Sequence, residues 1–200
     1  VKELFDRVVQ TAQGAALGTG TTMEVEVIHG IYNVLPNVSL QEVIYSNLQQ
    51  VGGVNYTPDE AAFAQTLQEA LPGNSPAITQ AATIQPLTIS ERGSGGSTDV
   101  ADVSWAVATG GMSAATWVPG TSAHSWQAIA AGGTSIGNKG MIVAAKTLAM
   151  TAVDLFTNPE LVENAKTEHQ GRIPEGWEYE PLLGDRAPPL DYRLPAGLGQ

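Results

Sequence analysis

The 200-residue chain contains no cysteine, so it forms neither disulfide bridges nor metal sites with thiolate ligands. Basic residues are scarce as well: nine Lys and Arg side chains stand against 20 Asp and Glu, which gives a formal net charge of -11. Such a chain repels phosphate backbones and anionic headgroups. We therefore expect neither nucleic acids nor anionic membrane surfaces among its partners.

Long apolar runs are also missing. No stretch reaches the roughly 20 apolar residues that span a bilayer, and the first residues lack the basic-then-apolar order of a signal peptide. A cytoplasmic protein without a membrane partner is the expectation. The hydrophobic content of 42% is sufficient for a core within one ordinary domain or within parts of two.

Helical patterns open the chain. Apolar residues at Leu4, Phe5, Val8 and Val9 lie on one helical stripe, and the helix is predicted to end in the region 14–20, which is rich in glycine. A second helix is predicted from Ser39, as its cap, to the glycine pair at 52–53, and the Pro36 region before it is expected to be extended.

Further helix signals follow. Thr57, Pro58 and Glu60 have the spacing of a capping box with proline in the first turn, so a helix should begin there. The most regular pattern predicts a helix over 139–156, stopped by Asn158-Pro159, with a shorter helix from Pro159 to His169.

Alternating polar and apolar residues predict strands over 22–29, 100–107 and 114–118. Residues 72–97 are rich in Pro, Gly, Ser and Thr and form a long loop, which can be a substrate gate or plain surface. Strands interleaved with helices indicate an α/β fold.

The stretch from Gly95 to Trp126 carries the candidate site, because Asp99, Asp102 and His124 lie at the ends of its predicted strands. On these residues alone, His124 can be either a turn histidine bonded to backbone or a metal ligand. Asp99 can cap a turn, and Asp102 can lie on a solvated strand face.

Residues 96–105 (GSTDVADVSW), 124–126 (HSW) and 132–156 (GGTSIGNKGMIVAAKTLAMTAVDLF) resemble the C-terminal third of M20-type metallo-amidohydrolases. They are most similar to the branch that resembles the B subunit of p-aminobenzoyl-glutamate hydrolases. The resemblance extends over most of residues 4–170.

This resemblance implies an α/β fold of three parts. Residues 1–36 would be the last helix and strand of an α+β lid or dimerisation domain. Residues 37–157 would be the C-terminal part of a zinc-peptidase-like catalytic domain, and residues 158–200 a helix and Pro-rich tail packed on it. The resemblance also implies a homodimer or a pair with a related subunit, with residues 4–29 at the contact.

The resemblance assigns roles to the candidate site. His124 would bind one or two divalent ions, zinc or manganese, and Asp99 would position the site or the substrate together with Gly96, Ser97 and Thr98. Most relatives carry Ser-Glu-Asp where this chain has Ser97-Thr98-Asp99, so one carboxylate is missing here. The other ligands and the general base are expected in sequence upstream of Val1.

The implied activity is hydrolysis of the amide bond of an N-acyl amino acid or dipeptide, a small-molecule substrate. The 200 residues alone should be inactive, and should be marginally stable because an apolar face is left uncovered. A noncatalytic binding subunit is the alternative. His29 and His169 are expected on the surface, and Trp105, Trp117 and Trp126 in the core or in a pocket wall.

Overall fold

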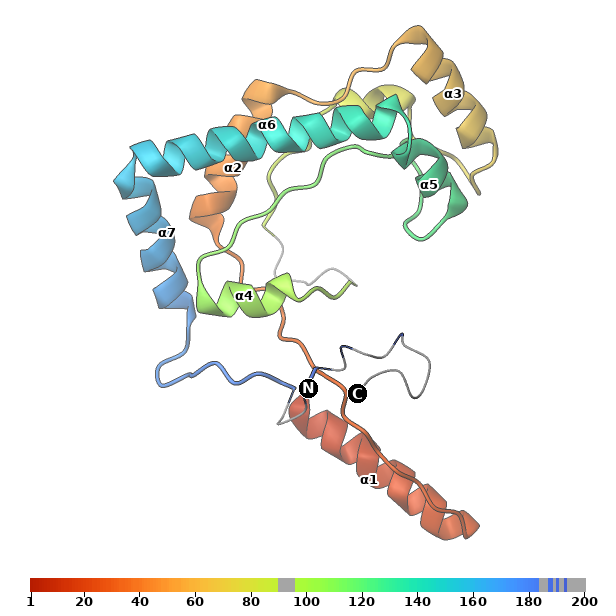
Figure 1. Ribbon diagram of the computed structural model, residues 1–200, viewed down its shortest axis with the longest axis vertical. Coiled ribbons are helices and arrows are strands. Elements are labelled where there is room, and N and C mark those ends of the chain that lie inside the picture. Colours follow the sequence, from red (N-terminus) through yellow and green to blue (C-terminus); the bar gives the residue numbers. More distant parts are fainter. Residues whose placement is uncertain (90–95, 184–186, 189, 191–192, 194–200) are drawn as a thin grey trace. The chain divides into compact units, whose positions relative to one another are not determined.

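The computed structural model describes residues 1–89, 96–183, 187–188, 190 and 193, and its contacts divide the chain into two compact units (Figure 1). The first unit consists of Val1–Tyr32 and Glu180–Gln200, and the second of Asn33–Tyr179. The three-part domain organisation predicted for the intact protein stays a prediction.

The first unit contains helix α1 (Lys2–Thr19). The helix ends as predicted, because Gly20 adopts the left-handed conformation (φ 64°) and its N–H reaches back to the carbonyls of Ala16 and Leu17. No residue of α1 is buried, so its apolar stripe, including Leu4 and Val8, is exposed.

The strand predicted over 22–29 is not formed, and these residues follow α1 as irregular chain. A strand exists only where its backbone pairs with a neighbouring strand. The described part of the chain contains no strand that could supply that ladder. The alternating pattern was therefore insufficient evidence for a strand here.

The second unit is helical. Its elements are α2 (Val38–Val51), α3 (Pro58–Glu69), the 3-10 helix η1 (Ile78–Ala82), α4 (Val100–Ala106), α5 (Trp126–Gly132), α6 (Ser135–Thr157) and α7 (Pro159–Arg172). Neither predicted strand of this unit is present, so within the described residues the structure shows the helices of the expected α/β fold without a sheet.

The strand predicted over 100–107 is helix α4 instead. Its valines at 100, 103 and 107 have a helical spacing of three and four, and only Val103 and Val107 also fit alternation. The helix begins where the N–H of Ala101 bonds to Thr98 O and that of Asp102 bonds to Asp99 O, both at 3.1 Å. Residues 114–118 remain irregular.

Most helix ends are fixed by hydrogen bonds between residues that are close in sequence. The capping box of α3 is formed as predicted, with the Thr57 hydroxyl and the Glu60 carboxylate each accepting from the other's N–H. Helix α2 ends at Gly52 as predicted, but its N-cap is Asn37 and not Ser39. Asn37 Oδ1 accepts from Leu40 N–H at 3.0 Å.

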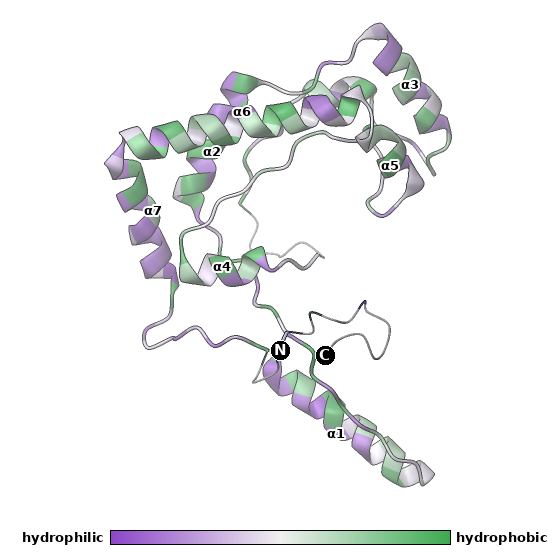
Figure 2. Ribbon diagram, viewed as in Figure 1, coloured by the Kyte–Doolittle hydropathy of each residue, from purple (hydrophilic) through white to green (hydrophobic). Residues whose placement is uncertain are grey.

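The long helix α6 is packed against α2, α5 and α7. Its buried residues in the middle are Thr147 and Thr151, and Asn47 of α2 donates to the Thr151 hydroxyl at 3.3 Å. Apolar residues such as Met141 and Phe156 are exposed instead. Figure 2 shows this helix mostly apolar and α7 mostly hydrophilic.

Helix α6 also has the length and mean hydropathy (1.4) of a membrane-spanning helix, by composition alone. It has no uninterrupted apolar run, because threonines and Lys139, Lys146 and Asp154 interrupt the sequence. Lys139 pairs with Glu60, and Thr151 accepts from Asn47 of α2. Of its 18-residue apolar window, 17% is buried within the described structure.

Candidate functional site

His124 lies in the loop of residues 119–125, between the irregular segment ending at Val118 and helix α5. The loop turns at Gly120 (φ 92°), where a Cβ atom would lie 3.0 Å from Ser75 Oγ. The dihedral angle favours glycine at this position, and a Cβ atom would also crowd Ser75 and Pro76.

Two glutamines fix the loop to α3. The Gln68 amide donates to the carbonyls of Pro76 (2.8 Å) and Pro119 (2.9 Å), so it joins the start of the loop to the segment after α3. On the other side, Gln127 Nε2 donates to Ala70 O at 3.1 Å. The loop is therefore anchored at both ends by side chains that bond to backbone.

His124 itself is exposed and has a φ of 58°. No other non-glycine residue in the described ranges has a positive φ. The next residue, Ser125, accepts from Ala128 N–H and donates to Ser122 O (2.7 Å), which caps α5. The histidine is thus presented to solvent by a loop whose neighbouring backbone is held in place.

The pocket beside His124 has a volume of about 560 Å³ and is lined by aromatic and apolar side chains. Trp117 and Trp126 are two of its walls, 38% and 61% exposed. These two tryptophans therefore line a pocket, as predicted. Trp105 is half-buried and stacks on Trp177 with ring centroids 4.5 Å apart.

The predicted positioning residues lie at the start of α4. Gly96, Ser97, Thr98 and Asp99 are all exposed, and Thr98 Oγ1 accepts from Val100 N–H at 3.3 Å. Asp99 occupies the N-cap position, yet its side chain bonds to no N–H of α4. Residues 90–95 of the predicted gate loop, which include Gly95, lie outside the described residues.

The structure does not join Asp99 to His124. No hydrogen bond or ion pair between the two is present in the described part of the chain, and the pocket at His124 does not include Asp99. Asp102 lies on helix α4 and not on a solvated strand, and its Oδ1 accepts from the Tyr179 hydroxyl at 3.0 Å.

A metal ion needs more than His124 supplies. Zinc sites in proteins use three or four ligands, and His124 offers one neutral nitrogen. In the described ranges no group of three or more His, Cys, Asp or Glu side chains is placed to hold a metal. The described residues alone do not form a complete metal site.

His169 was expected on the surface, and this prediction is wrong. The imidazole is buried, and its Nε2–H donates to Ser104 O at 2.9 Å. The Ser104 hydroxyl in turn accepts from Leu35 N–H at 2.8 Å. Nothing in the polar sequence of α7 indicates burial, because the contact comes from α4, 65 residues away along the chain.

Glu168, the neighbour of His169, binds the N-terminus of α2. It accepts from the N–H groups of Val38 (2.8 Å) and Ser39 (2.7 Å), from the Ser39 hydroxyl (2.7 Å), and from Arg172. Burial raises the pKa of this carboxyl, but the hydrogen bonds from Ser39, Val38 and Arg172 outweigh burial and lower it to about 2. This arrangement is structural, since every acceptor position faces protein donors.

A second low-pKa carboxylate connects α3 to α6. Hydrogen bonds from Lys139, Ser135 and Thr57 lower the pKa of Glu60 to about 2. Burial and the nearby Glu60 carboxylate raise the pKa of Tyr56. Like Glu168, Glu60 accepts hydrogen bonds from several donors within the protein, which is a structural arrangement.

Comparison with known proteins gives two relatives. The chain is 33% identical over 193 residues to the B subunit of p-aminobenzoyl-glutamate hydrolase from Escherichia coli K12, covering 85% of this chain and 40% of the relative. It is 28% identical over 166 residues to Xaa-Arg dipeptidase of Mus musculus, covering 82% of this chain and 31% of the relative. No family profile and no solved structure matches.

The chain therefore spans less than half the length of the curated relatives that it matches. Both relatives are M20-like peptidases, so the resemblance predicted from residues 96–105, 124–126 and 132–156 is confirmed. The site residues themselves are not tested by this similarity.

Proposed function

We propose, on the premise that the chain is similar to M20-type peptidases over most of its length, that it is part of a metal-dependent amidohydrolase. The intact protein would hydrolyse the amide bond of an N-acyl amino acid or a dipeptide. The names of the two relatives support this class, because one belongs to a p-aminobenzoyl-glutamate hydrolase and the other is an Xaa-Arg dipeptidase.

The observation that carries the proposal is the 33% identity over 85% of this chain. The geometry at His124 is compatible with it. An exposed imidazole on an anchored loop can provide one nitrogen to a divalent zinc or manganese ion whose other ligands come from outside these residues. Bound in that way, the ion would activate water or polarise the amide carbonyl.

Asp99, with Gly96, Ser97 and Thr98, keeps the proposed positioning role near the substrate. The general base is assigned to polypeptide beyond the 200 residues. A homodimer or a pair with a related subunit, in the cytoplasm, is also part of the proposal, and the pairing is supported because the bacterial relative is itself one subunit of a hydrolase. A noncatalytic subunit is the alternative that the following experiment separates.

The test is His124→Ala in the intact protein, assayed on p-aminobenzoyl-glutamate and on dipeptides ending in arginine. Loss of a ligand should lower turnover at least about a hundredfold. The free energy of unfolding should change by less than about 1 kcal/mol, because the side chain is exposed. Metal content is measured in parallel.

Ser122→Ala is the matched control, because Ser122 is exposed in the same loop. It should retain wild-type activity and metal content. If His124→Ala keeps activity within a few-fold of wild type with unchanged metal, His124 is not a ligand. If the intact wild-type protein hydrolyses neither substrate and binds no metal, the noncatalytic alternative holds.

A further inference from the structure

Two exposed tryptophans lie in the pocket beside His124. Trp126 is the first residue of α5 and is 61% exposed, and Trp117, in the irregular segment that ends at Val118, is 38% exposed. Two indoles in one pocket form a contiguous apolar surface, which is more informative than a single exposed side chain. This aromatic pocket has a volume of about 560 Å³ and is lined by Trp117, His124, Ser125, Trp126, Ala128 and Ile129.

Both indoles are positioned by α5. A Cβ at Gly132, the last residue of the helix, would lie 3.7 Å from Trp117 Nε1, so the Trp117 ring lies against this end of α5. At the other end Ser125 caps the helix, and the Gln127 amide bonds to the backbone at the end of α3. The backbone is therefore fixed on either side of Trp126. Aromatic walls that are already in place bind a ligand with little further loss of entropy.

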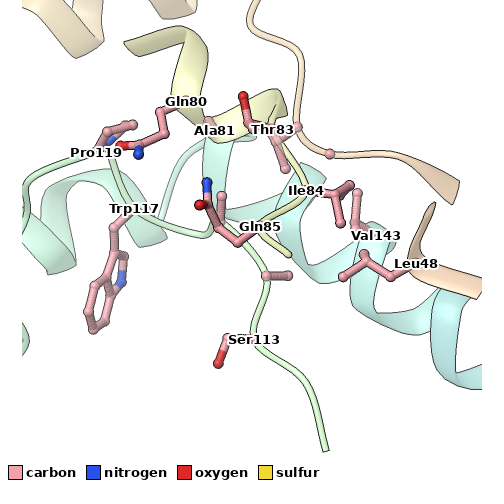
Figure 3. Close-up of a pocket in the computed structure, with 14 residues that line it drawn as sticks. Leu48, Gln80, Ala81, Thr83, Ile84, Gln85, Ser113, Trp117, Pro119 and Val143 are labelled. Carbon is pink, nitrogen blue, oxygen red and sulfur yellow. The ribbon is translucent and has the colours of Figure 1, made fainter. Parts of the chain in front are cut away.

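Trp117 also lines a second pocket, of about 520 Å³, together with Leu48, Ile84 and Val143 (Figure 3). In Figure 3 the Trp117 ring extends away from these three aliphatic side chains, which gather on the opposite side. The indole thus lies apart from them and borders the aromatic pocket.

The lining of the aromatic pocket contains no Asp, Glu, Lys or Arg, and its polar side chains are His124 and Ser125. The amino-acid half of an N-acyl amino acid carries a carboxylate, whose binding site needs a cation or several directed donors. An arginine side chain would find indole faces here but no carboxylate partner. An uncharged group fits this lining best, so the amino-acid half of a substrate should lie elsewhere.

We propose that the aromatic pocket binds the acyl half of the amide substrate and selects a planar aromatic ring bonded directly to the carbonyl carbon. This inference rests on the proposed amidohydrolase function and assigns its acyl specificity to Trp117 and Trp126. Because His124 lines the same pocket, a ring one bond from the carbonyl carbon can contact the indoles while the carbonyl stays beside the imidazole. Offset or edge-to-face contacts between aromatic rings favour an aryl group over a saturated ring of similar size.

The acyl selectivity of the intact protein tests the pocket. Benzoyl-glutamate and cyclohexanecarbonyl-glutamate share their amino-acid half and differ in the aromaticity of the ring. Wild type should have a kcat/KM at least about tenfold higher for benzoyl-glutamate, and Trp126→Ala should reduce this ratio at least about fivefold. Trp126→Phe should restore most of it, because a phenyl ring keeps an aromatic face. Loss of folded protein does not change the ratio, since both rates fall together.

Trp177→Ala is the matched control, because Trp177 is half-buried, stacks on Trp105 and does not line the aromatic pocket. It should leave the ratio unchanged. The proposal is overturned if Trp126→Ala also leaves the ratio unchanged. It is overturned as well if Trp126→Ala lowers kcat/KM for alanyl-arginine as much as for benzoyl-glutamate, because the pocket would then not select an aromatic acyl group.

A binding measurement separates the pocket from the proposed activity. The probe p-fluorobenzamide carries the aryl carbonyl group without an amino acid, and fluorine NMR follows its binding without turnover. Trp126→Ala should raise its dissociation constant at least about fivefold, and Trp177→Ala should not. Equal binding to wild type and Trp126→Ala overturns the proposal even if the protein hydrolyses benzoyl-glutamate. Binding that depends on Trp126 in a protein that hydrolyses no amide would support the pocket and reject the proposed activity.

Discussion

The corner where α7 meets the N-terminus of α2 and the loop that carries His124 use polar side chains in opposite ways. At the corner, Asn37 and His169 are buried and bonded, and the Glu168 carboxylate accepts from four donor groups. At the loop, the His124 imidazole is exposed, and the bonds that fix the loop come from other residues.

This difference separates polar groups that hold the fold from a polar group that is available to a ligand. A buried amide or carboxylate with all its partners in the protein has no capacity left for an external molecule. An exposed side chain on anchored backbone costs little stability when it is changed, and so can be selected for function. Four substitutions test this separation.

Asn37→Ala should have the largest effect. The side chain caps α2 through Leu40 N–H and donates to Ala165 O at 2.8 Å, and it is 1% exposed. Losing the cap, which leaves the Leu40 N–H without its acceptor, together with the bond to Ala165 O should lower the free energy of unfolding by about 3 kcal/mol. Urea denaturation measures this.

Asn158→Ala is the control for that substitution. Asn158 is also the N-cap residue of a helix, α7, but it is exposed and makes no side-chain cap bond. Asn158→Ala should lower the free energy of unfolding by less than about 1 kcal/mol. Equal effects at the two asparagines would show that burial at the corner is unimportant.

Glu168→Gln should cost about 2 kcal/mol at neutral pH, because charge-assisted bonds to the start of α2 are weakened. In the wild type the pKa falls from 4.5 to about 2 on folding. The stabilisation is therefore present above about pH 4.5 and is lost as pH falls toward 2. The variant should show a flatter loss of stability between pH 5 and 2 in acid titrations of the unfolding midpoint.

The control for the acid titration is Glu163→Gln, a change at an exposed glutamate on the same helix. It removes a carboxylate that makes no hydrogen bond to α2. Glu163→Gln is compared directly with Glu168→Gln. If both variants reduce the loss of stability between pH 5 and 2 equally, general charge repulsion and not the contact with α2 explains the pH dependence.

Gln68→Ala should cost about 1 kcal/mol, since two bonds to partly exposed carbonyls are lost. Its distinctive effect should be local: faster amide exchange and faster proteolysis within residues 119–125. Gln65→Ala, on an exposed position of the same helix, is the control and should leave the loop unchanged. Unaltered exchange in Gln68→Ala would mean that the loop is held by other contacts.

His124→Gly should have the smallest effect on stability. The position has a φ of 58°, which glycine adopts freely and other residues adopt at a cost of about 1 kcal/mol. We expect His124→Gly to be at least as stable as wild type and about 1 kcal/mol more stable than His124→Ala. Thermal unfolding of the three proteins is the measurement, and the reverse order would contradict the left-handed backbone.

Helix ends were predictable because their causes are local. Thr57 and Glu60 satisfy each other's N–H groups across one turn, Gly20 supplies the left-handed end of α1, and Pro159 fits the first turn of α7. Such signals need only four or five neighbouring residues. They hold whatever the rest of the chain does.

Non-local contacts were not predictable. The strand predicted over 100–107 was wrong because Val103 and Val107, four residues apart, fit both a strand and a helix. The burial of Ala101 and Ser104 is that of a helix. The prediction that His169 lies on the surface was wrong because its imidazole contacts Ser104, which is 65 residues away in the sequence. The candidate site divides in the same way: the flanks of His124 predicted the relatives, while a metal-ligand role for His124 stays a proposal.

The four tryptophans of the second unit form two pairs that differ in exposure to solvent. Trp105 and Trp177 stack on each other, whereas Trp117 and Trp126 are exposed and line the pocket beside His124. A small quencher in solution will therefore reach the second pair first, and their emission reports on the loop without any attached label. Because the chain has no cysteine, a single cysteine introduced at position 113 could carry an acceptor dye with no background labelling. The same molecule would then give a fluorescence signal from the loop and an energy-transfer signal from the pocket that Ser113 lines.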